Sequence, residues 1–200
     1  MTADEIYQAI QADPQNQKFT LQGIQPLYHV DPDAEILLIS QAPSRQAQAT
    51  MTFWDDASGD RLRDWMGVTK DQFYHSGKIA VLPLDFYYPG KQLHGGDLPP
   101  RKGVADKWHP ALLKLMPKIQ LTVLIGAYAQ KAYLSTRPKT LTAAVAHYAD
   151  YLPDYFPLVH PSPLNYGWLK QHPWFMTAVV PVLQRRVATI IDNNDRSGTT

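Results

Sequence analysis

The chain has 200 residues, of which 44% are hydrophobic and 18% are charged, and its formal net charge is +1. This composition predicts one globular domain with an adequate core. No window reaches the roughly 18 consecutive apolar residues of a membrane helix, and residues 1–11 have the pattern of an acidic, polar helix rather than a secretory signal. We therefore expect a soluble, cytoplasmic protein with no membrane partner.

Residue usage also limits the chemistry. The absence of cysteine excludes disulfides, thiolate nucleophiles, iron–sulfur clusters and cysteine zinc sites. None of the seven histidines has a metal-binding spacing such as His-Glu-x-x-His. We expect no metal and no cofactor, so catalysis would depend on ordinary side chains and backbone dipoles. The small net charge permits nucleic-acid binding without indicating it, because a binder needs positive charge on only one face.

Four short apolar runs predict buried strands, since each is followed by turn residues and helical periodicity separates them. They cover residues 36–40, 79–84, 121–125 and 156–159. Strands that alternate with helices favour a parallel sheet, because parallel strands need crossover connections. We expect an α/β fold, with residues 1–191 as a single domain and residues 192–200 as a flexible polar tail.

Helical patterns separate and follow these runs. Residues 127–134 form one such segment, and Pro110 and Pro173 fit the first turn of further helices. Near the C-terminus, a long helix is expected, which Pro181 should kink. Its buried face is marked by Phe175, Val179, Leu183, Val187 and Ile190.

The loops beyond the carboxyl ends of the strands are the expected ligand-binding region of such a sheet. Two prolines in the loop after the fourth run, residues 160–165, would fix a histidine, a serine hydroxyl and a leucine in preset directions. On the alternative interpretation, the prolines only end a strand, His160 is a capped surface residue and Leu164 belongs to the core. The loop after the first run, residues 40–44, also carries a proline turn.

Read together, the two loops resemble the uracil-DNA glycosylase superfamily. Members carry a first motif such as Gly-Gln-Asp-Pro-Tyr or Gly-Glu-Ala-Pro-Gly and a last motif His-Pro-Ser-Pro-Leu. The corresponding segments are Ser40-Gln41-Ala42-Pro43-Ser44 and His160-Pro161-Ser162-Pro163-Leu164. Residues 53–62 resemble the pocket-forming Phe and small-residue turn, residues 121–134 the third strand and helix, and residues 95–101 a cysteine-free bacterial branch. The resemblance covers residues 35–190.

The resemblance implies a three-layer α/β/α sandwich with a four-stranded parallel sheet in the order 2-1-3-4. It implies a monomeric, cofactor-free enzyme that flips uracil or another deaminated base out of DNA and hydrolyses its N-glycosidic bond. The expected cleft is narrow enough for a pyrimidine and brings together residues 40–44, Phe53, Asp85 and residues 160–164. Leu164 and residues 165–168 are expected to project as an insertion loop.

Site roles follow from the same resemblance. His160 would donate to the uracil carbonyl oxygen, Gln41 would bind the base or a water, and Phe53 would stack on the base. Leu164 would be the wedge, and Ser44 and Ser162 would hold phosphate. Further substrate-binding residues are expected to be Ser40, Ala42, Pro43 and Asn165, and further DNA contacts Pro163, Arg101 and Lys102.

One departure from the family pattern concerns carboxylates. Ala42 and Gln41 stand where other members have Asp or Glu, so the first loop has no acidic group to orient water. A missing general base costs roughly 10²- to 10⁴-fold in rate, which weakens an enzyme without abolishing it. Asp85, just beyond the second run, is the nearest substitute, and a turn-capping role is its alternative interpretation.

Other classes of protein fit less well. An α/β-hydrolase needs the motif Gly-x-Ser-x-Gly, and a nucleotide-binding domain needs Gly-x-Gly-x-x-Gly or a Walker loop. The sequence contains none of these motifs. The remaining rival is a non-catalytic or weakly active homologue that keeps the fold and binds DNA or a nucleobase without turnover.

Overall fold

Four parallel strands form the centre of the molecule, which we describe from a computed structural model over residues 1–93, 96–136 and 138–192. The strands are β1 (Ile36–Ile39), β2 (Ile79–Val81), β3 (Leu121–Ile125) and β4 (Tyr155–Leu158). Their order is β2-β1-β3-β4, and every pairing is parallel. The fold class and the strand order predicted from the sequence are confirmed.

Strand boundaries differ slightly from the prediction. The second run was expected to extend to residue 84, but β2 ends at Val81 because Pro83 has no N–H for the ladder. Pairing continues beyond the strand through single hydrogen bonds, from the Leu84 amide to the Ser40 carbonyl at 2.8 Å and from the Asp85 amide to the Gln41 carbonyl at 3.1 Å. These bonds join the first loop to the chain that leaves β2.

Strand β1 divides the core into two, because its side chains alternate between the faces of the sheet. Ile36 and Leu38 pack on one face, and Leu37 and Ile39 pack on the other, all essentially buried. A run that is apolar at every position therefore fits a strand covered on both sides.

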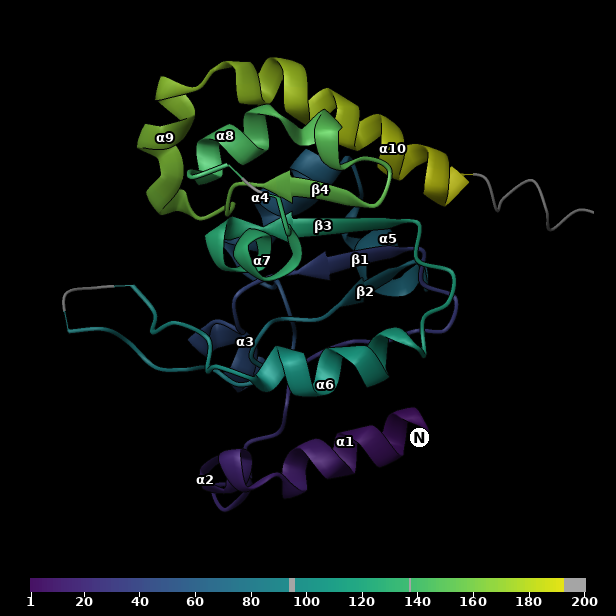
Figure 1. The fold of residues 1–200 in the computed structure, drawn as a ribbon, viewed down its shortest axis with the longest axis vertical. Coiled ribbons are helices and arrows are strands. Elements are labelled where there is room, and N and C mark those ends of the chain that lie inside the picture. The colour runs from purple at the N-terminus through teal and green to yellow at the C-terminus, as the bar shows by residue number, and fades with distance from the viewer. Residues whose placement is uncertain (94–95, 137, 193–200) are drawn as a thin grey trace, which may run out of the picture.

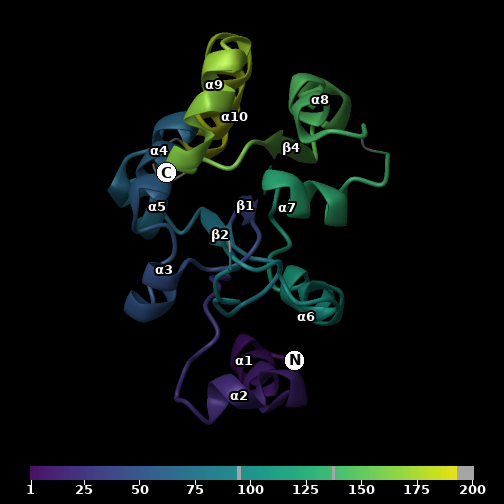
Figure 2. The ribbon, with the colours of Figure 1, turned by 90° about the vertical axis from the view of Figure 1, so that its left-hand side faces the viewer.

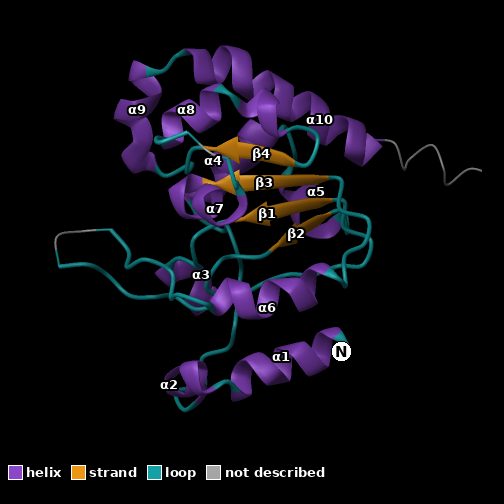
Figure 3. Ribbon diagram, in the orientation of Figure 1, coloured by secondary structure: helices purple, strands orange, loops and turns teal. Residues whose placement is uncertain are grey.

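Helices cover both faces, as Figures 1 and 3 show. One face carries α4 (Ala57–Met66), α5 (Lys70–His75) and α10 (Val180–Asp192). The other carries α1 (Ala3–Ala12), α2 (Gln17–Thr20), α6 (Val104–Leu113) and α7 (Gly126–Tyr133). In Figure 2, α4 and α5 lie on one side of the sheet and α6 and α7 on the other.

Shorter helices and turns complete the chain. They are η1 (Pro14–Asn16), α3 (Arg45–Thr50), α8 (Leu141–Ala146), η2 (Tyr148–Tyr151), η3 (Pro163–Asn165) and α9 (Tyr166–Gln171). Over the described ranges no helix is long and apolar enough to cross a membrane. The tail expected over residues 192–200 lies outside the described residues apart from Asp192, which ends α10.

Of the three prolines expected in helices, Pro110 occupies a different position from the predicted one. Pro110 lies inside α6, which begins at Val104 after Gly103 in the left-handed conformation, so the first-turn prediction was wrong. Pro173 immediately precedes the C-terminal helical segment. Pro181 is the second residue of α10, and a π-helical turn, η4 (Phe175–Val179), precedes it. The predicted apolar face of this segment, from Phe175 to Ile190, is buried.

His109, a buried histidine in α6, holds the chain just beyond β2 in place. Its Nε2 lies 3.1 Å from the Pro83 carbonyl oxygen, and its Nδ1 lies 2.5 Å from the Tyr133 hydroxyl. Burial lowers the pKa of His109 to about 4, so the ring is neutral at pH 7. A neutral ring with its proton on Nε2 donates to the Pro83 carbonyl and accepts from Tyr133. Helix α6 therefore holds the chain at Pro83, two residues beyond the end of β2.

Candidate functional site

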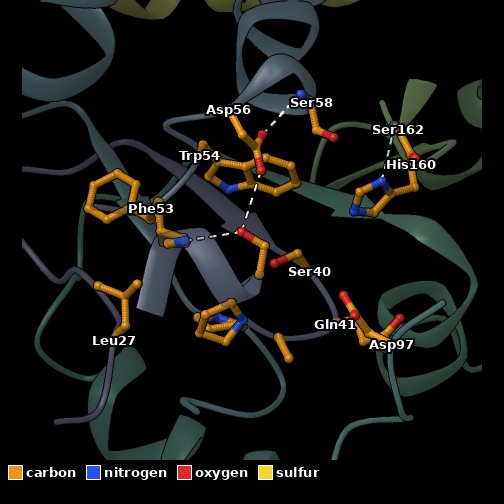
Figure 4. Close-up of a pocket in the computed structure, with 16 residues that line it drawn as sticks. Leu27, Ser40, Gln41, Phe53, Trp54, Asp56, Ser58, Asp97, His160 and Ser162 are labelled. Atoms are coloured by element: carbon orange, nitrogen blue, oxygen red, sulfur yellow. Dashed lines mark hydrogen bonds between the residues drawn. The ribbon is translucent and has the colours of Figure 1, made fainter. Parts of the chain in front are cut away.

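A pocket of about 190 Å³ opens at the carboxyl ends of β1, β2 and β4 (Figure 4). The two motif loops and the turn before α4 all contribute to it. The sequence predicted that these segments would lie together. Its lining residues are Leu27, Ser40, Gln41, Ala42, Pro43, Ser44, Ala47, Phe53, Trp54, Asp56, Ser58, Val81, Pro83, Asp97, His160 and Ser162.

The first loop forms one wall of this pocket. Gln41 donates its side-chain N–H to the Leu98 carbonyl at 2.7 Å, so its amide oxygen is left to accept a hydrogen bond from a ligand. Ser44 caps α3 by accepting from the Ala47 amide at 3.1 Å, and its hydroxyl lies 3.4 Å from an oxygen of Asp56. The loop therefore presents an amide oxygen and a helix N-terminus to the pocket.

Two aromatic residues form a second wall. The Phe53 ring stacks on His29 with 5.6 Å between centroids. Trp54 has φ of 58°, a strained value for a large side chain, and its carbonyl accepts from Arg63 at 3.0 Å. A Cβ added at Gly59 would lie 1.7 Å from the Trp54 carbonyl oxygen. Only glycine therefore fits at position 59 in α4, and the close packing fixes the turn.

His160 lies two residues beyond the end of β4, on the far side of the pocket from Phe53 in Figure 4. Its Nδ1 accepts from the Ser162 amide at 3.2 Å, which places the proton of the neutral ring on Nε2. In Figure 4 this second nitrogen is directed into the pocket. Burial lowers the pKa of His160 and outweighs the opposing effect of Asp56 and Asp97. At pH 7 the pocket therefore contains a neutral, oriented N–H donor.

The rest of the last motif holds His160 in place. Asn165 donates its side-chain N–H to the His160 carbonyl at 2.8 Å, and Arg61 of α4 donates to the Ser162 carbonyl at 3.1 Å. The Trp54 ring lies 5.6 Å from the imidazole. Asn165 does not line the pocket, so its position supports His160 rather than a bound base.

Two carboxylates that the sequence analysis missed line the pocket. Asp56 caps α4, with one oxygen accepting from the Ser58 and Gly59 amides at 2.9 Å each. Asp97 is exposed and accepts from the Tyr88 hydroxyl at 3.3 Å. The position of Asp56 could have been predicted from one feature of the sequence. It is an acidic residue directly before a helix that has small residues in its first turn. Within the described ranges, no three His, Asp or Glu side chains are grouped to hold a metal ion.

Asp85 is not in this pocket, contrary to the expectation that it joins the cleft. It is fully buried and forms an ion pair with Arg101 through bonds of 2.7 and 2.8 Å. The Tyr87 and Arg101 amides donate to the same carboxylate. With both oxygens engaged away from the pocket, Asp85 cannot substitute for a first-loop carboxylate. Arg101 is likewise engaged by Asp85 and the Gln15 carbonyl, whereas Lys102 is exposed.

The predicted wedge lies at the surface. Leu164 is 88% exposed, and its amide donates to the Ser162 hydroxyl oxygen at 3.2 Å. Pro163 and Tyr166 are also exposed. The projection is shorter than expected, because Trp168 turns inward, contacts the core and donates to the Thr142 hydroxyl at 2.9 Å. Leu164 is therefore a surface residue and not part of the core.

Comparison with known proteins identifies the family of the chain. A sequence model of the uracil DNA glycosylase superfamily matches residues 27–184, and the chain belongs to that superfamily. Among solved structures, it is similar to a solution NMR structure of a "putative Uracil DNA glycosylase" from Methanosarcina acetivorans. The two are 14% identical, the match covers 80% of this chain and 97% of the other, and the TM-score is 0.45.

Loss of the buried ion pair should be costly to stability. Arg101→Ala leaves the Asp85 carboxylate buried and unpaired, so the free energy of unfolding should fall by about 3–5 kcal/mol. Denaturant unfolding of the variant measures this, with Arg185→Ala, an exposed arginine of α10, as the control. A loss below about 1 kcal/mol, typical of exposed pairs, would contradict the structural role assigned to Asp85.

Proposed function

We propose that the chain is a DNA glycosylase that hydrolyses the N-glycosidic bond of uracil, or of another deaminated base, after flipping the nucleotide into the pocket. The observation that carries the proposal is the neutral His160, whose Nε2–H is directed between the aromatic wall and the first loop. Glycosidic cleavage leaves negative charge on the departing base. A fixed donor at the base carbonyl oxygen stabilises that charge where it develops.

The other pocket residues support the same reaction. Phe53 offers its ring to the face of the base, and the Gln41 amide oxygen can accept a base N–H. The sugar becomes positively charged as its bond to the base breaks, and the Asp56 carboxylate lines the same pocket as His160. The base leaves with the electrons of the broken bond, water adds its oxygen to the sugar C1′, and the proton that water loses balances the proton that the base gains.

The pocket contains a carboxylate from another element, although the first loop carries none. Gln41 and Ala42 supply no acidic group, but Asp56 brings one into the pocket from α4. We assign to Asp56 the role of facing the sugar cation and the attacking water. Its position is fixed by the Ser58 and Gly59 amides, so no reorganisation is needed at the moment of reaction.

The first test is cleavage itself. Single-turnover cleavage of a uracil-containing single strand should be measurable in the wild type and fall roughly 10²- to 10³-fold in His160→Ala, the usual cost of one charge-stabilising donor. His147→Ala, an exposed histidine, is the matched control and should keep the wild-type rate. If the wild type binds this oligonucleotide but never cleaves it, the non-catalytic interpretation holds instead.

A second test isolates the pocket carboxylate. Asp56→Asn keeps the helix cap, since Asn and Asp are nearly equal there, but removes the charge, so cleavage should slow by about 10²-fold with little loss of stability. The control is Asp71→Asn, an exposed first-turn carboxylate of α5. A normal rate in Asp56→Asn together with a slow Asp97→Asn would assign the role to Asp97.

A third test concerns the exposed leucine. Leu164→Ala should slow cleavage of uracil in a duplex more than in a single strand, because a flipped base leaves a gap only where stacking and pairing are disrupted. The measurement compares single-turnover rates on both substrates for the variant and the wild type. Equal losses on the two substrates would show that Leu164 does not act as a wedge.

A further inference from the structure

A cavity separate from the pocket lies at the opposite end of the sheet. It has a volume of about 420 Å³ and opens between α10, the start of β3 and the chain before β4. Leu121, the first residue of β3, and Pro153, two residues before β4, line it. In Figure 1 the C-terminal end of α10 lies on the side where these strands begin, away from their arrowheads. The length of a strand, about 15 Å, therefore separates this cavity from the pocket.

Two arginines of α10, Arg185 and Arg186, give the cavity its charge. Both line it, and its described lining contains no acidic residue. Within the described ranges, neither arginine forms an ion pair with a carboxylate. Glu35 accepts a hydrogen bond from Gln120 of the lining, but Lys78 already balances its charge at 2.6 Å. Two guanidinium groups are therefore available to an anionic ligand.

The number of charges favours a phosphate monoester over a carboxylate as the anion. A phosphate monoester carries a charge of about −1.5 to −2 at pH 7, which two arginines match, whereas a carboxylate carries a single charge. The planar guanidinium group also binds phosphate oxygens through paired, parallel hydrogen bonds. Since Arg185 and Arg186 are adjacent in α10 and both line the cavity, one phosphate can contact both side chains.

The rest of the lining suits the body of a nucleoside. Four lining residues are apolar and can cover a flat base: Leu121, Pro153, Val182 and Ile190. Thr189 donates its hydroxyl hydrogen to the Arg185 carbonyl at 2.8 Å, and Gln120 donates its side-chain N–H to Glu35. The side-chain oxygens of Thr189 and Gln120 are left as acceptors. They can therefore accept hydrogen bonds from the hydroxyl and N–H groups that a nucleoside carries.

We propose that this cavity binds a nucleoside monophosphate. The phosphate contacts the Arg185 and Arg186 guanidinium groups, the base packs on the apolar residues, and Gln120 and Thr189 accept from the sugar or the base. The volume of the cavity lies within the range of small-molecule sites, about 300–1,000 Å³. Because the cavity and the pocket are at opposite ends of the sheet, this proposal does not rest on the proposed function.

Isothermal titration calorimetry with adenosine monophosphate tests the proposal. The wild type should bind this nucleotide, and Arg185→Ala/Arg186→Ala should bind it about tenfold or more weakly, the usual effect of losing hydrogen bonds to a charged group. Arg186→Lys keeps the charge but loses the paired geometry, so its affinity should lie between those of the wild type and Arg186→Ala. Adenosine, which lacks the phosphate, and inorganic phosphate, which lacks the base, should each bind about tenfold or more weakly than the nucleotide.

Two controls locate the binding. Arg45→Ala, an exposed arginine of α3, and His160→Ala, in the pocket, should both bind the nucleotide as the wild type does. Denaturant unfolding checks that each variant is folded. Loss of binding in a folded His160→Ala would place the nucleotide in the pocket and overturn the proposal.

Other results would also overturn it. They are no binding by the wild type, unchanged affinity in Arg185→Ala/Arg186→Ala, and inorganic phosphate that binds as tightly as the nucleotide. An oligoglutamate peptide that displaces the nucleotide at a lower concentration, and loses affinity in the arginine variant, would assign the cavity to an acidic peptide instead. If the nucleotide binds as expected while uracil is never cleaved, only the proposed function fails.

Discussion

The sheet edge that carries the pocket depends on one constraint, the buried ion pair between Asp85 and Arg101. Asp85 leaves β2 with its carboxylate fully buried, and burial of an unpaired charge is prohibitive. The chain must therefore return so that Arg101 can neutralise it. That return brings Asp97 to the pocket and places the Leu98 carbonyl where the Gln41 side chain donates to it. Arg101 also donates to the Gln15 carbonyl, which joins the N-terminal helices to the chain that returns from β2.

Strands and motif loops could be predicted because their signals are local. The run Ile36–Ile39 is apolar at every position, and this fits a strand covered on both faces wherever its neighbours lie. Parallel strands also end at one edge, so Gln41 and His160 could be expected to meet although more than a hundred residues separate them. Their meeting needs only the topology and no detail of side-chain packing.

Residues whose roles depend on a distant partner could not be predicted in the same way. Asp85 and Asp56 both follow an apolar or aromatic stretch and both precede a turn, so their sequences suggest similar roles. Arg101, 16 residues further on, turns one into a buried structural anion, whereas the start of α4 places the other at the pocket. Trp54 was missed because its strained backbone depends on close packing against Gly59.

The pocket holds two kinds of group that could interfere with each other, the N–H donor of His160 and the carboxylates of Asp56 and Asp97. Two carboxylates near a histidine favour its protonated form, and an imidazolium would be neutralised by them instead of serving the leaving base of the proposed reaction. Burial opposes this effect and keeps the His160 pKa below its ordinary value, while Ser162 keeps the remaining proton on Nε2. The pocket therefore holds a neutral donor and an acidic group at the same time. The reaction proposed for this pocket, in which a bond breaks into an anion and a cation, uses both groups.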